Sequence, residues 1–168
     1  MTLVELMLAT AVGSVIMLGM AQLMTYSGRS FAAMANYVSL DRASRNALDT
    51  MSKQIRQANK LTDFSATSLT FEDADGGTLT FSYNSDERRL IRSKNGVADS
   101  KALLTECDYL RFSIFQRNPI GGSYNVYPTA TPATCKLVQL SWICSREIFG
   151  LKVNTESVQT SKIVIRKQ

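Results

Sequence analysis

The chain has 168 residues, of which 45% are hydrophobic and 20% are charged, so one domain with an appendage is expected. Its 19 lysines and arginines against 14 acids give a formal net charge of +5, and it contains no histidine. Without histidine the chain lacks the commonest general base and zinc ligand, which disfavours Ser-His-Asp, Cys-His and histidine–metal chemistry. Three cysteines are too few for a four-thiolate zinc site and allow at most one disulfide within the chain.

The first expected element is a long apolar helix. No charged residue occurs from Leu6 to Gly28, a run of about 23 residues that reaches roughly 34 Å as a helix. This length matches the hydrocarbon thickness of a bilayer, which predicts a membrane-embedded segment. The flanks are unlike those of a signal peptide, because no basic residue precedes the run and no small-residue cleavage site follows it. We therefore expect that a charged leader has been removed upstream of Met1.

Glu5 is the acid at the edge of this run. A carboxylate carried to the middle of a bilayer costs about 2.5–3.5 kcal/mol, so Glu5 needs a partner there. At the membrane interface, by contrast, it would favourably oppose the positive N-terminal end of the helix dipole. The residue alone leaves both interpretations open.

The segment Met1-Thr2-Leu3-Val4-Glu5-Leu6-Met7, followed by an uninterrupted apolar helix, resembles the mature N-terminus of type IV pilins and type II secretion pseudopilins. The resemblance implies that a prepilin peptidase removes a basic leader and methylates the new terminal amine, that of Met1. It also implies an ionic contact between Glu5 and the terminal amine of a neighbouring subunit. Two buried opposite charges are tolerable only as a hydrogen-bonded pair, which agrees with that role.

Two glycines interrupt the apolar run. Many pilins carry a proline near position 22, where this chain has Gln22. Gly13 and Gly19 each weaken a helix by about 1 kcal/mol, so the helix is expected to unwind between them in a filament. The alternative is that the two glycines allow close packing of helices in a membrane.

Beyond Gly28 the helix is expected to continue and to become amphipathic, so that one helix extends from about Leu3 to Asn59. Apolar residues recur at spacings of three and four, which predicts a single face covered by a sheet. These residues are Phe31, Met34, Val38, Leu48, Met51, Ile55 and Ala58.

The second half of this helix carries most of the excess positive charge. Residues 29–60 hold six basic and two acidic residues. We expect a solvated helix face that meets acidic patches on neighbouring subunits. Nucleic-acid binding through Arg42, Arg45 or Lys53 is the less favoured interpretation, since it would require a free face with interleaved aromatic residues.

From residue 68 the hydrophobic period changes to two, which predicts an antiparallel sheet of five to six strands. Two strands form a hairpin around the turn at 73–77, whose acids lack the full EF-hand spacing. Further strands are expected at 88–92, 110–114, 138–142 and 163–165. Residues 116–136 hold all three prolines, and a loop of this length is a candidate contact between subunits.

The length of chain between the cysteines limits which of them can form a disulfide. Cys135 and Cys144 enclose eight strand-like residues, which extend over roughly 30 Å, so these two should not pair. If strands 108–116 and 136–144 are antiparallel neighbours, Cys107 and Cys144 come together. We expect a Cys107–Cys144 disulfide, which needs a bulge to bring both side chains to one face. Cys107–Cys135 is the alternative, and three reduced buried thiols are a third, although an exported domain favours oxidation.

These patterns predict an α+β fold that resembles the pilin fold, in which a long N-terminal helix packs on an antiparallel β-sheet. The expected parts are the hydrophobic helix 1–28 and a globular domain 29–168, with amphipathic helix 29–60 and sheet 68–168. The carboxylates are scattered at turns, the serines have no base, and no glycine-rich phosphate loop occurs. We therefore expect no enzyme, no cofactor and no metal site.

The resemblance implies a structural subunit of a bacterial type IV pilus-like extracellular filament. Copies of the chain would rest in the inner membrane through their apolar helices and then assemble, served by the prepilin peptidase, an assembly ATPase and an inner-membrane platform. One alternative is a minor pilin or a pseudopilin that primes or caps a fibre, including a periplasmic pseudopilus. Another is a DNA-binding or adhesive pilin that uses the basic helix face or the 117–135 loop.

Overall fold

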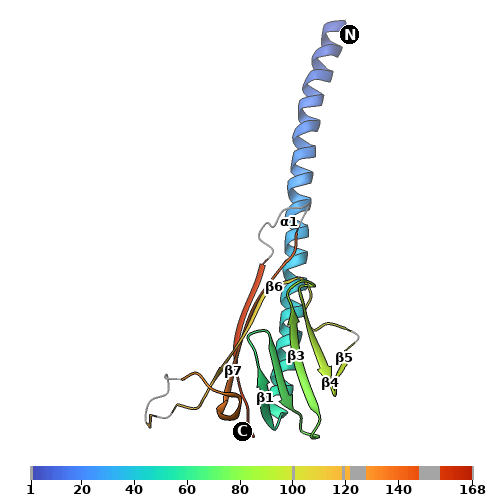
Figure 1. The fold of residues 1–168 in the computed structure, drawn as a ribbon. Coiled ribbons are helices and arrows are strands. Elements are labelled where there is room, and N and C mark those ends of the chain that lie inside the picture. The colour runs from blue at the N-terminus through green and yellow to red at the C-terminus, as the bar shows by residue number, and fades with distance from the viewer. Residues whose placement is uncertain (1, 100, 119, 122–127, 148–155, 168) are drawn as a thin grey trace.

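The fold consists of one long helix and two antiparallel sheets. The computed structural model describes residues 2–99, 101–118, 120–121, 128–147 and 156–167. Helix α1 (Leu3–Gln57) is continuous over 55 residues. Its first half rises clear of the globular domain and its second half packs on the sheets (Figure 1). The predicted α+β arrangement of a long N-terminal helix on antiparallel strands is confirmed.

The helix ends two residues before the predicted Asn59. At Ala58 the backbone turns to an extended conformation, with ψ at 148°, while its N–H still donates to the Gln54 carbonyl at 2.9 Å. The chain then enters strand β1 at Lys60. The predicted amphipathic helix 29–60 therefore extends too far, and the sheet begins before the predicted residue 68. The sequence hides β1 because only Leu61 in this strand is buried.

Five strands form the first sheet, in the order β1-β2-β3-β4-β5. Their bounds are β1 (Lys60–Phe64), β2 (Ser68–Glu72), β3 (Thr78–Asn84), β4 (Arg89–Lys94) and β5 (Val97–Ala98). The predicted β2–β3 hairpin is confirmed: it pairs Leu69 with Phe81 and Phe71 with Leu79. Its turn is closed by a 2.7 Å bond from the Asp73 N–H to the Gly77 carbonyl, with Gly76 at a positive φ of 79° that favours glycine.

The second sheet has the order β6-β7-β8. Its strands are β6 (Cys107–Phe115), β7 (Leu137–Ser145) and β8 (Glu156–Val164), and the single-turn 3-10 helix η1 (Pro132–Thr134) precedes β7. The prediction of one sheet with five to six strands was therefore wrong, because the described strands number eight in two sheets. The two sheets are joined by isolated backbone bonds, such as the 2.8 Å bond from the Phe112 N–H to the Ala66 carbonyl.

The core lies between the second half of α1 and the two sheets. The helix contributes Leu40, Ala47, Met51 and Ile55, each at most 3% exposed. The sheets contribute a larger set of buried side chains, including Leu69, Phe71, Phe81, Leu90, Phe112, Leu140 and Trp142. Fully burying one such side chain stabilises the fold by about 1.5–3 kcal/mol, so this core holds the helix firmly on the sheets.

The apolar residues of the helix do not form the single face that their spacing predicted. Met51, Ile55 and Ala58 are fully buried, whereas Phe31 is 72% exposed and Met34 is 68% exposed. Phe31 and the buried Leu40 are nine residues apart, and nine residues place side chains about half a turn out of phase. The stripe formed by Phe31, Met34 and Val38 therefore faces away from the sheets. We call it the outer apolar stripe.

Candidate assembly interface

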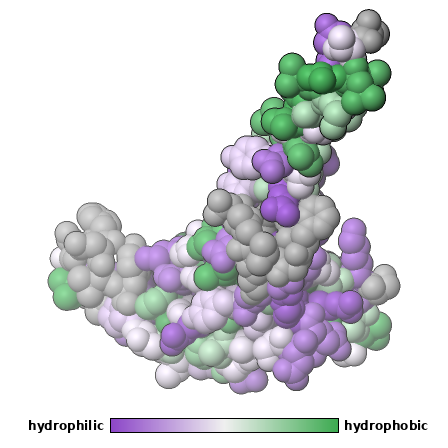
Figure 2. Space-filling model, turned by 90° about the horizontal axis from the view of Figure 1, so that it is seen from above, coloured by the Kyte–Doolittle hydropathy of each residue, from purple (hydrophilic) through white to green (hydrophobic). Residues whose placement is uncertain are grey.

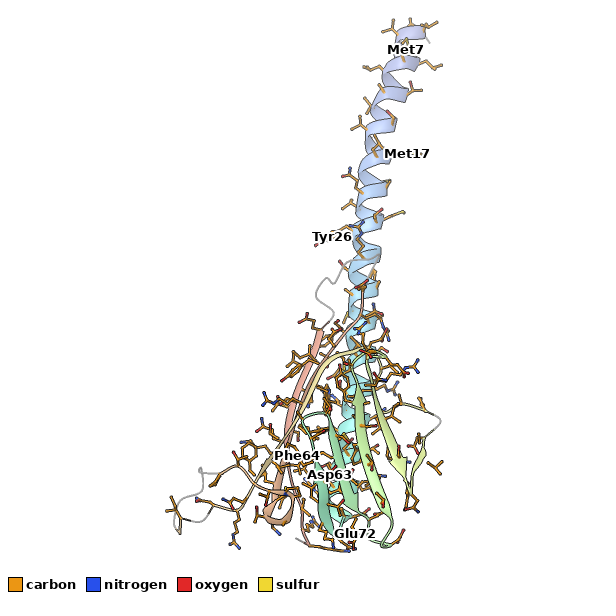
Figure 3. The ribbon with its side chains drawn as sticks, viewed as in Figure 1. Met7, Met17, Tyr26, Asp63, Phe64 and Glu72 are labelled. Atoms are coloured by element: carbon orange, nitrogen blue, oxygen red, sulfur yellow. The ribbon has the colours of Figure 1, made fainter. Side chains whose placement is uncertain are left out.

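The first half of α1 is an apolar rod that the domain leaves uncovered. Every residue from Thr2 to Phe31 is exposed. Met7, Met17 and Tyr26 project from the rod in different directions (Figure 3), and hydrophobic residues gather on the face of the rod that is seen from above (Figure 2). By length and composition this helix can cross a membrane, and its most apolar window is 0% buried. A core helix of a soluble protein would be mostly buried, so the rod needs another apolar environment.

The hydroxyl groups on the rod are satisfied within the helix. Thr10 donates to the Leu6 and Met7 carbonyls at 3.1 and 3.0 Å, and Ser14 donates to the Ala11 carbonyl at 2.8 Å. Thr25 donates to the Ala21 carbonyl at 2.9 Å in the same way. Because lipid offers no hydrogen-bond partners, such internal bonds allow these residues to enter an apolar phase at low cost.

Glu5 caps its own helix. The Thr2 N–H donates to the Glu5 carboxylate at 2.8 Å, and the Glu5 N–H donates to the Thr2 hydroxyl at 3.4 Å. This is a capping box, which satisfies two backbone donors at the helix start and places a negative charge at the positive end of the dipole. Thr2 was missed in the sequence, although the pattern Thr-x-x-Glu before an apolar run signals such a cap.

The intersubunit role predicted for Glu5 stays a prediction. Met1 lies outside the described residues, so the contact between Glu5 and a terminal amine is untested. The capping box nevertheless holds the Glu5 carboxylate at the N-terminal end of the rod. This is where a neighbouring amine would have to approach for the predicted ion pair.

The glycines of the rod sit in regular helix. α1 is unbroken through Gly13 and Gly19, and a Cβ added at either would meet nothing within 4 Å. The open space is compatible with a second helix approaching closely at these positions. Unwinding between them in a filament stays a prediction.

The basic face of the helix is exposed, as expected. Arg42, Arg45 and Lys53 all lie on the exposed side of α1. Arg45 donates to Asp41 at 2.8 Å and stays 71% exposed, so this pair contributes little to stability. The candidate 117–135 loop is described only in part, because residues 119 and 122–127 lie outside the described ranges. Ile120 within it is 57% exposed.

A buried polar contact docks the helix on the second sheet. The Trp142 indole N–H donates to the Ser44 hydroxyl at 3.3 Å, and the hydroxyls of Ser44 and Ser157 lie 3.4 Å apart. Ser44 is the one fully buried polar residue of the described helix. Burying these groups without partners would cost about 1–3 kcal/mol each, so the contact fixes one orientation of the helix. No sequence pattern indicated it, since the three residues come from three distant elements.

Cys107 and Cys144 face each other across β6 and β7. Their Cα atoms are register partners, and the ladder shifts between Cys107 and Tyr109, where the sequence required a bulge. Both side chains are buried and all three thiols are free. Contact with Cys107, followed by burial, raises the pKa of Cys144. The disulfide itself stays a prediction.

Cys135 lies at the other end of the β6–β7 ladder. The Lys136 N–H next to it donates to the Phe115 carbonyl at 2.9 Å, at the opposite end of β6 from Cys107. The alternative pairing of Cys107 with Cys135 is incompatible with this register, because β6 is nine residues long. Burial raises the pKa of Cys135 to about 11, so its thiol is unreactive at neutral pH.

Ion pairs and hydrogen bonds connect α1 and the strands at the point where the rod leaves the globular domain. Arg146 binds Glu106 at 2.6 Å and also donates to Asn36 of the helix at 3.2 Å. The hydrogen bond with Glu106 raises the pKa of Arg146 further. Arg88 binds Asp108 at 2.6 Å and donates to the Ser145 carbonyl at 3.0 Å. These contacts join α1 to both sheets at the base of the rod.

Comparison of the chain with protein-family models, with curated proteins and with solved structures finds no match. The geometry described above is therefore what the function has to be argued from.

Proposed function

We propose that this chain is a structural subunit of a type IV pilus-like filament, held in the bacterial inner membrane by its N-terminal rod before assembly. The observation that carries the proposal is the rod itself, which is apolar, wholly exposed and rigidly continuous with a folded domain. The resemblance of the first residues to prepilin-type N-termini supports it.

The free energy of burial favours an apolar environment for the rod both before assembly, in lipid, and after assembly, among the rods of other copies. Burying one large apolar side chain is worth about 1.5–3 kcal/mol, and the rod exposes many of them, from Leu3 to Tyr26. Such a surface is untenable in water but is covered equally well by lipid or by the rods of other copies. Movement from membrane to filament then requires little net free energy from burial, and an assembly ATPase would supply the work of extraction.

The first test is the N-terminus and the location of the full-length chain. We expect fibres sheared from the producing cells to contain the chain, and mass spectrometry to show an N-methylated Met1. An unmodified terminus, together with a chain that remains monomeric in the membrane, would contradict the proposal. The copy number in the fibres distinguishes a major subunit from a minor one that primes or caps the fibre.

The second test separates the charge of Glu5 from its capping role. Glu5→Gln removes the charge but retains an oxygen that accepts the bond from the Thr2 N–H. Thr2→Ala removes the other half of the capping box and keeps the charge. We expect Glu5→Gln to stay in the membrane and to lower the amount in sheared fibres by tenfold or more, and Thr2→Ala to assemble. Normal fibres from Glu5→Gln would exclude the charge-pair role.

A further inference from the structure

The globular domain has two ends along the helix axis. The proximal end surrounds the point where the rod emerges, marked by the contact between Arg146 and Asn36. The distal end surrounds the end of α1, marked by the 2.8 Å bond from Lys167 to Asn59. The helix between them measures about 32 Å from Asn36 to Gln57 at 1.5 Å per residue. The C-terminus lies at the distal end, far from the N-terminus (Figure 1).

The proximal end carries excess negative charge. Among its described residues outside the helix there are six acids and three arginines, namely Asp86, Glu87, Arg88, Arg89, Glu106, Asp108, Arg146, Glu147 and Glu156, a net charge of −3. Arg29 of α1, about two turns before Asn36, adds one cation, so the net charge there stays negative. The pairs Arg88–Asp108 and Arg146–Glu106 neutralise four of the residues outside the helix. The surplus consists of exposed carboxylates, which we call the proximal acidic group: Asp86, Glu87, Glu147 and Glu156.

Within the described ranges, three members of this group form no ion pair, and Glu87 only approaches Arg89 at 3.9 Å. The β-ladder and the turn hold all four at the same end. Glu156 is the register partner of Ser145, next to Arg146 and Glu147. Asp86 and Glu87 lie in the β3–β4 turn, beside Arg88 and its bond to Ser145. Their carboxylates are therefore available to a cationic partner.

The distal end carries the opposite charge. Its described residues include seven cations and four acids, namely Lys53, Arg56, Lys60, Lys94, Lys136, Arg166, Lys167, Asp49, Glu72, Asp73 and Asp75, a net charge of +3. Lys60 pairs with Glu72 at 3.0 Å, and Lys94 pairs with Asp73 and Asp75 at 2.7 and 3.3 Å. The exposed surplus, which we call the distal basic group, is Lys53, Arg56, Arg166 and Lys167.

The distal basic group borders a surface groove between the last helical turns and the C-terminal segment. Lys53, Arg56 and Arg166 line this groove together with Asp49. None of the four cations of the group forms an ion pair within the described chain, and Lys167 donates to the neutral amide of Asn59. The groove thus presents three cations and one acid, a net positive lining, to an acidic partner.

We propose that the distal end of one copy docks on the proximal end of the next copy, with the distal basic group against the proximal acidic group. This inference rests on the proposed function and names the surfaces that would be used in the fibre. A contact between two different surfaces of identical chains generates an open filament when it repeats, unless its rotation closes a ring. Complementary charge fixes the orientation of such contacts more than their affinity.

The sign of the charge also favours a protein partner over a lipid surface. While the rod is in a membrane, the proximal end faces the headgroups, and its net negative charge is repelled by anionic lipids. The same acids become favourable only when a cationic surface replaces the membrane. The second copy supplies that surface at its distal end.

Zero-length carbodiimide cross-linking of fibres of the full chain tests the docking directly. The reagent joins a lysine to a carboxylate that it touches, and Lys53 and Lys167 are at the opposite end of the domain from Glu147 and Glu156. Because about 30 Å separates the two ends within one copy, any such cross-link must join two copies. We expect mass spectrometry to find Lys53 or Lys167 linked to Glu147 or Glu156.

Charge-reversal variants test the docking through the yield of fibres. We expect Lys53→Glu with Arg56→Glu to lower the fibre yield about tenfold, since two attractive contacts become repulsive. Adding Glu147→Lys with Glu156→Lys should restore the yield. The matched control, Lys101→Glu with Arg111→Glu, makes the same change in net charge at exposed positions outside both groups and should leave the yield unchanged. Thermal unfolding of each variant checks that the domain is folded.

Each outcome decides the inference. Fibres that form normally without these cross-links, and that tolerate the reversal, overturn the docking and leave the proposed function standing. A reversal that the compensating pair does not rescue, but that abolishes salt-dependent retention of the chain on DNA, assigns the distal basic group to nucleic acid instead. A wild-type chain that forms no fibres at all overturns both proposals.

Discussion

Two methionines on the same helix provide a sharp test of which face of α1 is structural. Met51 is fully buried between the helix and the sheets, whereas Met34 is 68% exposed on the outer apolar stripe. The substitutions Met51→Ala and Met34→Ala remove the same atoms and gain the same helix propensity. Any difference between them therefore reports the environment of the side chain.

The expected magnitudes differ by several fold. Truncating a buried methionine to alanine costs about 2–5 kcal/mol, because the transfer free energy is lost and a cavity remains. An exposed substitution usually changes the free energy of unfolding by less than about 0.5 kcal/mol. Against a typical total stability of about 5–15 kcal/mol, Met51→Ala removes a large fraction and Met34→Ala almost none. Met51→Leu keeps the volume and should cost less than about 1.5 kcal/mol.

Trp142 is a built-in reporter for this measurement. It is the chain's only tryptophan, it is 1% exposed, and its indole N–H donates to Ser44 of the helix. Urea unfolding of the full chain in mild detergent, followed by tryptophan fluorescence, therefore reports separation of the helix from the second sheet. Equal destabilisation by Met51→Ala and Met34→Ala would refute the assignment of the two faces.

Two further predictions concern the thiols and the acids. In the exported protein we expect peptide mapping without reduction to find Cys107 joined to Cys144 and Cys135 free. Reduction should then lower the free energy of unfolding by about 3–4 kcal/mol, since the bond closes a long loop; a Cys135-containing disulfide would contradict the register. The pKa of Asp73 lies below its ordinary value of 3.8, because Lys94 and the Ala74 N–H bond to its carboxylate. A carboxyl group whose pKa is lower in the folded protein than in the unfolded chain stabilises the fold at pH values above its unfolded-state pKa. This stabilisation is lost as the pH falls through the folded-state pKa, so the free energy of unfolding should decline below about pH 4. Asp73→Asn should flatten that decline, and a stability–pH profile of this variant that matches the wild type would refute the effect.

The elements with local, repetitive signals could be predicted from the sequence. The uncharged run after Glu5 and the absence of proline and glycine from Phe31 to Lys60 determine a long helix, because helix formation depends on neighbours three and four residues away. The strict alternation around Phe71 and Phe81 and the glycine turn between them determined the β2–β3 hairpin. These patterns act within one element, so no distant partner is needed to see them.

The placement of Cys107 opposite Cys144 in the β6–β7 ladder was predictable for a different reason. Two strands of similar length with a reach limit between the cysteines allow few registers, and the mismatch of faces demanded the bulge that the ladder shows. By contrast, β1 buries a single leucine and carries Lys60 and Asp63. Its place in the sheet depends on pairing with β2 rather than on its own pattern.

The sequence by itself determined an apolar rod, an acid at its start and an α+β domain behind it. Only the tertiary structure decided which side of the helix the sheets cover. Phe31, Met34 and Val38 recur at the same intervals of three and four residues as Met51 and Ile55. These intervals identify an apolar stripe but do not show that the first stripe lies half a turn away from the second. The separation of charge between the two ends of the domain was likewise not predictable, because the charged residues come from the helix, the β3–β4 turn, strand β8 and the segments that follow β7 and β8, which meet only when the chain folds.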